Sequence, residues 1–302
     1  MVAKDYRYEL LKGSKHIICP NCQKKTFKPY VDSETQEIVD AEKFGRCERI
    51  NSCGYIAYPD IKGGDLKDWT PPPPQPYQEP IPDLIPREII EATFHSFKQN
   101  VFFMWLVHLF GMDKAYELQT KYNIGTAKNG GTIFWQQDSD GNFRTGKVMY
   151  YQPNGKRDKD RKSWYVHKKL ERERNKGKAE EERAEYTLVQ VFFGEHLIRN
   201  DTPLALCESE KTAILMSIFQ PEYTWIAAGG ANMLNLYRLG RLPRLDFVSP
   251  DNGQFRLWEN QTKIFNGRQM DVRVDQAVRE GRLGDGADIL DLYLIEGVKP
   301  NG

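Results

Sequence analysis

The sequence lacks a strong net charge, a long hydrophobic run and a P-loop. Lysine and arginine total 43 against 42 aspartate and glutamate residues, so the formal net charge is only +1. The field of the whole protein is therefore weak, and any nucleic-acid site must come from local clustering of cations. The longest apolar run, VFFMWLVHLF at residues 101–110, is too short to span a bilayer. No segment reads G-x-x-x-x-G-K-[ST], which excludes a motor of that type.

The first residues also lack an apolar stretch of the kind that secretory signal peptides carry. They read MVAKDYRYELLKG, in which charged residues interrupt every short apolar group. We therefore expect a cytoplasmic protein that has no membrane partner.

Cysteine is scarce, and four of the five cysteines fall within the first 53 residues. One pair has the Cys-x-x-Cys spacing of a zinc knuckle, and a second, wider pair follows the hairpin expected from residues 24–46. Four thiolates close a tetrahedral site, so we predict structural zinc rather than a disulfide framework. The alternatives are unrelated reduced thiols, or His16 in place of one cysteine. The predicted zinc ligands are Cys19, Cys22, Cys47 and Cys53.

Proline is concentrated in residues 68–86, which read DWTPPPPQPYQEPIPDLIP. Prolines remove backbone donors and fix φ, so this segment can be neither a central strand nor a helix. We interpret it as a semi-rigid spacer, with a peptide-recognition motif as the alternative. The predicted domains are a zinc ribbon at 1–62, a linker at 63–86, a basic α+β subdomain at 87–186 and an α/β domain at 187–302.

The predicted basic subdomain begins with helices and continues with hairpins. Residues 86–111 and 113–123 have helical apolar spacing, and residues 130–157 alternate around Asp-Gly and Asn-Gly turns. Cations and aromatic residues are then interleaved as far as residue 169. Cations neutralise phosphates while aromatic rings stack on bases, so this composition favours a track for single-stranded nucleic acid. The alternative is a solvated charged face beside a mixed-charge segment at 171–185.

Seven residues are predicted to contact nucleic acid. They are the cations and one tryptophan of this track, together with one lysine from the C-terminal half: Arg144, Lys147, Lys156, Arg157, Lys162, Trp164 and Lys211.

From residue 203 onward, short apolar strands alternate with amphipathic helices. The strands are expected at 203–207, 223–228, 245–249 and 270–274, with helices at 211–219, 232–240 and 255–265. This order predicts a parallel sheet covered on both faces. Ligands of such sheets collect outside the carboxyl ends of the strands.

Carboxylates follow three of these segments. Glu208 comes directly after the first strand, Asp251 follows the third, and Asp288 and Asp291 follow the last. Clustered carboxylates repel one another unless a cation holds them, so we predict that these four residues bind magnesium or manganese. Glu210 is better explained as an acid in the first turn of a helix capped by Ser209, with a direct metal role as the alternative.

The segment CESEKTA, at 207–213, resembles the glutamate motif of Toprim domains, the metal-binding fold of primases, topoisomerases and some nucleases. The resemblance spans 204–294 and continues in WIAAGGANM, FVSPDNG and GADILDLYL. The order of zinc ribbon, basic subdomain and Toprim region resembles that of primases, and it is similar to primase-like proteins of bacterial mobile elements and prophages. The implied fold is α/β, with a Toprim-like Rossmannoid parallel sheet, a preceding α+β subdomain and an N-terminal zinc ribbon.

The resemblance also implies roles for the acids. Glu208 would be the acid/base glutamate, Asp251 the first aspartate of an aspartate-x-aspartate pair, and Asp288, with Asp291, the later metal ligands. One departure stands out, because Gly253 occupies the position of the pair's second aspartate. Glycine offers no side-chain oxygen, so a two-metal arrangement loses a ligand there.

The implied activity is nucleotidyl transfer from nucleotide triphosphates on single-stranded DNA or RNA, in replication of a mobile element or phage. A helicase would have to be a separate polypeptide. The alternatives are a catalytically degenerate Toprim adaptor that only binds nucleic acid, and a Toprim nuclease that uses the same acids with water as nucleophile.

Overall fold

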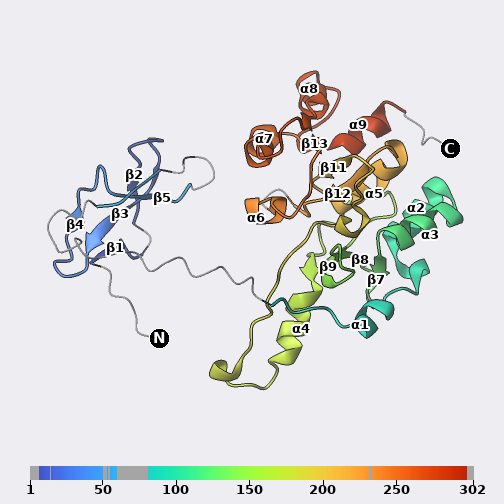
Figure 1. Ribbon diagram of the computed structural model, residues 1–302, viewed down its shortest axis with the longest axis horizontal. Helices are drawn as coiled ribbons and strands as arrows, with labels where there is room; N and C mark the ends of the chain where they lie inside the picture. Colours follow the sequence, from blue (N-terminus) through green and yellow to red (C-terminus); the bar gives the residue numbers. More distant parts are fainter. Residues whose placement is uncertain are drawn as a thin grey trace. The chain divides into compact units, whose positions relative to one another are not determined.

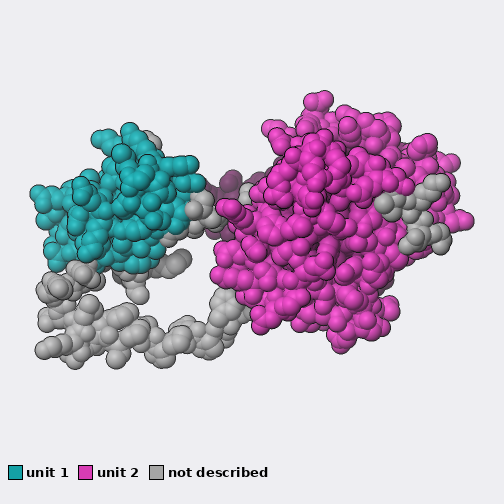
Figure 2. Space-filling view, turned by 90° about the horizontal axis from the view of Figure 1, so that it is seen from above, with its two compact units in different colours: residues 1–77 teal, residues 78–302 magenta. Residues whose placement is uncertain are grey.

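The computed structural model describes residues 7–13, 15–49, 53, 55–59, 81–230 and 233–297. The chain has two compact units, residues 1–77 and 78–302 (Figure 1, Figure 2). The Pro-rich stretch predicted to be a linker lies outside the described residues up to position 80. Within these ranges, no helix is long and apolar enough to cross a membrane.

The first unit is a small antiparallel β structure. Its strands are β1 (Tyr8–Leu10), β2 (Ile17–Ile18), β3 (Lys25–Asp32), β4 (Ile38–Val39), β5 (Gly45–Cys47) and β6 (Ile56–Ala57). The long strand β3 pairs with β1, β2, β4 and β5, which confirms the predicted hairpin. Phe27 on β3 is fully buried, and a Cβ on Gly45 would lie only 2.5 Å from its ring. Glycine at position 45 therefore permits the close β3–β5 pairing.

The second unit begins with helices and a four-stranded antiparallel sheet ordered β10-β9-β8-β7. The elements are α1 (Arg87–Glu91), η1 (Phe97–Gln99), α2 (Val101–Phe110), α3 (Met112–Lys121), β7 (Ile124–Thr126), β8 (Thr132–Gln137), β9 (Phe143–Met149), β10 (Trp164–Tyr165), α4 (Val166–Arg174), η2 (Glu180–Glu182) and η3 (Glu195–Leu197). The helix expected at 86–111 is interrupted. Ser96 adopts a left-handed φ of 56°, and α2 starts afresh where the Asn100 side chain accepts a hydrogen bond from the Phe103 N–H.

The remainder of this unit is built on a parallel sheet ordered β12-β11-β13-β14, as predicted. Its elements are β11 (Leu204–Cys207), α5 (Glu210–Phe219), β12 (Thr224–Ala227), α6 (Leu236–Leu239), β13 (Phe247–Ser249), α7 (Phe255–Thr262), β14 (Gln269–Met270), α8 (Arg273–Arg279) and α9 (Ile289–Ile295).

The last predicted strand, 270–274, is correct only at its first residue, because β14 ends at Met270. The Asp271 carboxylate accepts hydrogen bonds from the backbone of Arg273 and the hydroxyl of Ser249, and α8 begins at Arg273. The chain therefore leaves the sheet after Met270. As a consequence, Asp288 follows α8 and begins α9, instead of directly following a strand.

The antiparallel and parallel sheets of the second unit share one hydrophobic core. The same cluster of buried side chains contains Phe134 from β8, Ile214 from α5 and Trp225 from β12. Tyr122, which is also fully buried, donates its hydroxyl to the Trp225 carbonyl at 3.2 Å. The boundary expected at 186/187 thus lies inside one compact body, which fixes the two sheets relative to each other.

Candidate functional site

The four predicted zinc ligands come together in the first unit. All four sulfurs lie within 4.8 Å of one another, and the Cys19–Cys53 and Cys22–Cys47 Sγ distances are 3.7 and 3.9 Å. Zinc–sulfur bonds of about 2.3 Å in a tetrahedron require sulfurs roughly 3.8 Å apart. The geometry and the thiolate donor set therefore fit zinc.

Neighbouring donors lower the pKa of the Cys22 and Cys53 thiols, whereas burial raises the pKa of Cys19 to about 11. The Asn21 amide donates to Cys53 Sγ at 3.4 Å, and the backbone N–H of Lys24 is the main cause that lowers the pKa of Cys22 to about 6. His16 instead contacts Glu48 at 2.5 Å, so the alternative of a histidine ligand is not favoured. Among the residues that the structure describes, these cysteines are the one group of three or more histidine, cysteine, aspartate or glutamate side chains whose ligand atoms all lie within 4.8 Å of one another.

Two of the predicted acids lie at one edge of the parallel sheet. Cys207 and Ser249 are paired at the carboxyl ends of β11 and β13. Glu208 directly follows Cys207 and Asp251 lies two residues after Ser249, so both leave the sheet at the same edge. Burial, followed by the charges of Glu208 and of the α9 aspartates, raises the pKa of Asp251 to about 9, whereas Lys211 opposes the shift. A pKa raised this far means that Asp251 keeps its proton at neutral pH unless a cation offsets the burial and the neighbouring charges.

The two α9 aspartates have structural roles at the start of that helix. Asp288 is the N-cap and accepts from the Asp291 N–H at 3.0 Å, while the Asp291 carboxylate accepts from the Asp288 N–H at 3.1 Å. Thr212 on α5 donates its hydroxyl to Asp288 Oδ2 at 2.5 Å. Burial is the main cause that raises the pKa of Asp288, and the Asp291 charge adds to it. The two aspartates thus form a reciprocal capping box at the start of α9, and the Thr212 hydrogen bond links it to the start of α5.

The edge carboxylates can hold magnesium without the α9 aspartates. Magnesium is commonly bound by one or two protein carboxylates together with waters and substrate phosphates. Glu208 and Asp251 could supply such oxygen ligands, and burial, followed by the charge of Glu208, raises the pKa of Asp251. The metal roles of Asp288 and Asp291 remain predictions.

The turn that carries Gly253 is held in place by an aspartate from α8. The Asn252 amide and the Gly253 N–H both donate to Asp275 Oδ1, at 2.8 and 3.0 Å. Gly253 has a φ of +80°, and a Cβ built there has no atom within 4 Å. The missing second aspartate thus corresponds to a left-handed glycine turn facing open space.

Glu210 has a buried partner. As predicted, Ser209 caps α5, its side chain accepting from the Thr212 N–H at 3.1 Å. Glu210 is 1% exposed and lies 3.1 Å from the Lys147 ammonium, which also donates to the Gly229 carbonyl at 2.7 Å. Lys147 is therefore engaged inside the protein, where it neutralises Glu210, and it does not present the exposed cation that the sequence pattern indicated.

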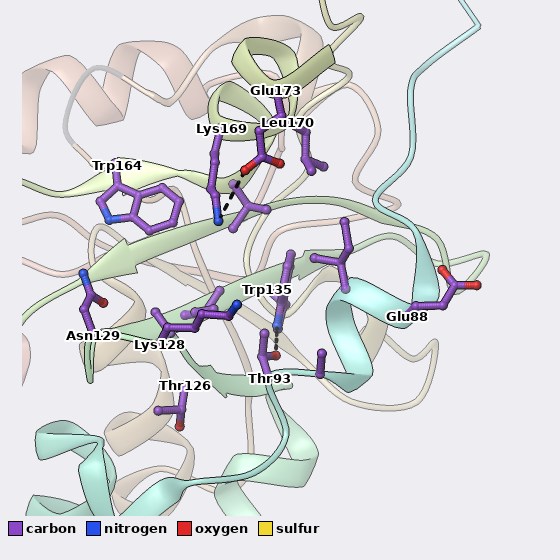
Figure 3. A pocket seen from close by; sticks show the side chains of 15 residues that line it. Glu88, Thr93, Thr126, Lys128, Asn129, Trp135, Trp164, Lys169, Leu170 and Glu173 are labelled. Carbon is purple, nitrogen blue, oxygen red and sulfur yellow. Dashed lines mark hydrogen bonds and ion pairs between the residues drawn. The ribbon is translucent and has the colours of Figure 1, made fainter. Parts of the chain in front are cut away.

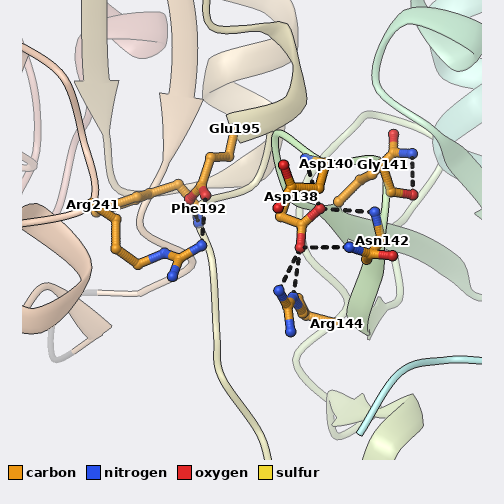
Figure 4. A network of polar contacts seen from close by, with 9 residues as sticks. Asp138, Asp140, Gly141, Asn142, Arg144, Phe192, Glu195 and Arg241 are labelled. Atoms are coloured by element: carbon orange, nitrogen blue, oxygen red, sulfur yellow. Dashed lines mark hydrogen bonds and ion pairs between the residues drawn. The ribbon is translucent and has the colours of Figure 1, made fainter. Parts of the chain in front are cut away.

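Arg144 is likewise occupied, as Figure 4 shows. Its guanidinium donates to Asp138 Oδ2 at 2.6 and 2.7 Å, and Asp138 is fully buried. The other Asp138 oxygen accepts from the backbone of Asp140 and Asn142, which closes the turn before β9. Arg144 thus neutralises a buried carboxylate, and this structural pair was missed because both residues lie in a polar hairpin sequence.

The other predicted nucleic-acid contacts lie at or near the surface. Lys156, Arg157 and Lys162 are exposed in the segment between β9 and β10, and Trp164 is partly exposed at the start of β10. Lys211 lies 5.8 Å from the ring centroid of Trp105. Their binding role remains a prediction.

A cavity of about 540 Å³, drawn in Figure 3, adds residues that the sequence pattern did not single out. Lys128, Asn129 and Lys169 line it together with Trp135 and the predicted Trp164. The available signal was the Ala-Lys-Asn-Gly-Gly turn at 127–131, since a tight turn places polar residues beside the strand that carries a tryptophan.

The fold and its sites define a zinc-ribbon protein with a mixed α/β unit. Residues 6–65 match a zinc beta-ribbon finger family, and residues 100–251 match the family described as a domain of unknown function, DUF6371. The latter match covers half of the chain, so this protein belongs to that family. No curated protein matches the chain.

Two solved structures from bacteriophage T7 are distantly similar. The primase fragment of the T7 primase-helicase protein is 12% identical with a TM-score of 0.39, over 96% of this chain and 100% of that one. The second structure contains the T7 lagging-strand DNA polymerase interacting with gp4 primase domains bound to an RNA/DNA hybrid and dTTP. Its matched chain is 16% identical with a TM-score of 0.34, over 60% of this chain and 85% of that one. Likenesses of this strength carry no functional inference.

Proposed function

We propose that this protein is a primase-like nucleotidyltransferase with a Toprim-like domain, which acts on a single-stranded DNA template in replication of a mobile element or phage. One observation carries the proposal: Glu208 and Asp251 follow adjacent parallel strands at their carboxyl edge, and burial, followed by neighbouring carboxylate charge, raises the pKa of Asp251 to about 9. A carboxyl group with a strongly shifted pKa at the ligand-binding edge of an α/β sheet is typical of a functional site.

In this proposal, Glu208 and Asp251 would hold magnesium or manganese, which when bound would polarise a phosphoryl group and neutralise developing charge. Glu208 also accepts the proton of the attacking hydroxyl at its carboxylate. The hydrogen bond from Thr212 to Asp288 fixes the start of α5, the helix that directly follows Glu208 and Ser209. The zinc ribbon and the exposed cations beside Trp164 hold the template, and nucleotide triphosphates are the substrates. A helicase would be a separate partner.

A non-catalytic adaptor is the second candidate. Gly253 supports it, because the turn at this position offers no second carboxylate, and the capping box gives Asp288 and Asp291 roles that need no metal. A nuclease is a further candidate, which would use the same Glu208 and Asp251 with water as nucleophile. Only the reaction products, cleaved strands instead of extended ones, distinguish this activity from nucleotidyl transfer.

The test is turnover of labelled nucleotide triphosphates on single-stranded DNA with magnesium or manganese, with extension and cleavage products resolved on one gel. We compare wild type with Glu208→Gln and Asp251→Asn, and with Asp285→Asn as a matched control at an exposed acid of the loop before α9. The proposal expects metal-dependent synthesis that the first two changes reduce at least a hundredfold and the control leaves intact. Cleavage alone would favour the nuclease. Intact binding without products would favour the adaptor.

A further inference from the structure

The cavity of Figure 3 lies among α1, the β7–β8 turn and α4, within the second unit. Its volume of about 540 Å³ is in the range of small-molecule sites. The floor is apolar, formed in part by Ile133, Val166 and Leu170. Trp135 is fully buried there, and its indole N–H donates to the Thr93 hydroxyl at 3.0 Å, so this polar group is already satisfied.

One wall is an indole held in a fixed orientation. The Trp164 N–H donates to the Tyr150 hydroxyl at 3.1 Å, and the Asn129 amide donates to the same oxygen at 2.7 Å. On Tyr150 itself, the Arg161 guanidinium lies 3.6 Å from the ring centroid. Trp164 remains partly exposed, so a rigid aromatic surface borders the cavity.

The β7–β8 turn places polar groups at the mouth. The Ala127 N–H donates to the Gly131 carbonyl and the Gly130 N–H to the Ala127 carbonyl, which closes a tight turn. Gly130 has a φ of +75°, a conformation that favours glycine. The turn thereby presents Lys128 and Asn129, both exposed, beside Trp164 (Figure 3).

Cations continue on the other side of the tryptophan. Trp164 also borders a second hollow, which is lined by Lys168, Arg172 and Arg183 with one carboxylate, Glu171. The cavity itself has two lysines and two glutamates in its lining, and Lys169 lies 3.6 Å from Glu173. Over both hollows, cations outnumber carboxylates. Fixed aromatic surface flanked by cations complements a base flanked by phosphates, more closely than it complements an apolar peptide.

We propose that this cavity receives one nucleobase of a single-stranded nucleic acid, stacked on Trp164. The phosphate on one side of that base is contacted by Lys128, and the strand continues past Trp164 toward Arg172 and Arg183. This inference rests on the proposed function only for its single-stranded ligand. It requires no chemistry at the acidic edge.

A bulky side chain at the mouth can block the cavity while Trp164 and the cations around it stay in place. Ala92 lines the cavity, is exposed, and has helical backbone geometry at the end of α1, so Ala92→Trp fills the mouth with little strain. Met112→Trp adds the same side chain at an exposed position of α3 and is the matched control. Binding is measured by fluorescence anisotropy with labelled (dT)12 and with a strand of equal length that carries abasic sites.

We expect wild type and Met112→Trp to bind (dT)12 about tenfold more tightly than the abasic strand, the contribution of one stacked base. Ala92→Trp should lose about tenfold in affinity for (dT)12 and should no longer distinguish the two strands. Its salt dependence should stay as in wild type, because no charge is changed. Equal binding by Ala92→Trp and wild type would overturn the cavity as a base site.

A second measurement needs no variant. A strand carrying 5-iodouracil is photocrosslinked to the wild-type protein, and the modified peptide is identified by mass spectrometry. A crosslink at Trp164 supports the inference, whereas crosslinks confined to other tryptophans overturn it. If wild type binds no single strand at all, the template-binding part of the proposed function fails too. Tight, base-dependent binding without nucleotide turnover would refute only the catalytic part.

Discussion

Lys147 on β9 and Glu210 at the start of α5 form a buried ion pair, with 3.1 Å between Nζ and Oε2. Lys147 also donates to the carbonyl of Gly229, two residues after the end of β12. Glu210 lies two residues after Glu208, so this pair connects the antiparallel sheet to the helix start behind the acidic edge. The relative position of the two sheets thereby depends on a charge contact as well as on the shared core.

Replacing Lys147 by methionine should leave the Glu210 charge buried without its partner. We expect a loss of about 3–5 kcal/mol in the free energy of unfolding, since breaking a buried pair strands one charge. The double variant Lys147→Met with Glu210→Gln should recover part of this loss. Urea unfolding of both measures the effect, with Lys114→Met as control, because its pair with Glu117 is exposed and should contribute under about 1 kcal/mol. Additive effects would mean that the two side chains do not interact.

Zinc should be needed by the first unit and not by the second. The purified chain should contain one equivalent of zinc by mass spectrometry, and Cys22→Ser should lose it. A chelator should unfold the β-strands described in the first unit while the second unit unfolds at an unchanged temperature, because the two units are separately compact. Hydrogen exchange resolves the two units. Full protection of β3 in metal-free protein would contradict the zinc assignment.

The parallel sheet and its acidic edge could be predicted from the sequence because each depends on local pattern. The runs at β11, β12 and β13 are apolar and short, and each is followed by a turn or a helix start, so their order alone indicates parallel pairing. Carboxyl ends of neighbouring parallel strands meet at one edge, so the positions of Glu208 and Asp251 after β11 and β13 indicate a candidate site there, and its metal role stays a prediction.

The partners of the cations could not be predicted in the same way. Lys147 lies 63 positions before Glu210, and nothing local to β9 distinguishes it from an exposed lysine. The early end of β14 has a similar cause, since the Asp271 side chain competes for the backbone N–H of Arg273 and starts a helix. Long-range polar pairing and local side-chain capping therefore account for the main errors.

The buried pair of Asp138 and Arg144 should be a major contribution to the stability of the second unit. Asp138→Asn leaves the nearly buried Arg144 guanidinium without its counter-charge, and we expect a cost of about 3–5 kcal/mol. Asp140→Asn, at an exposed position of the same turn, should change stability by less than about 0.5 kcal/mol. Both are measured by urea unfolding. Similar values for the two variants would mean that Asp138 acts only through the turn.

Stability should also depend on pH through Glu195, which Figure 4 draws near the Asp138 network. Burial raises the pKa of Glu195, although its carboxylate accepts from the Phe192 N–H at 2.9 Å and lies 3.7 Å from Arg241. A raised pKa means that the folded state binds this proton more tightly than the unfolded state. Relative to Glu195→Gln, wild type should therefore lose stability as pH rises from about 4.3, the ordinary pKa, to the raised value, and then level off. Urea midpoints of both proteins from pH 4 to 8 test this. A constant difference would contradict the shift.

Gly253 offers a way to ask whether the acidic edge holds a cation. Its φ of +80° should cost Gly253→Ala about 1 kcal/mol of stability, and Gly253→Asp meets the same backbone strain but no steric clash. Without divalent metal, Gly253→Asp should be the less stable of the two, because it adds negative charge near Asp251. Magnesium should reverse this order if the new carboxylate completes a cation site with Glu208 and Asp251. Thermal unfolding with and without magnesium gives the comparison. An order that magnesium leaves unchanged would mean that Gly253 does not face the bound cation.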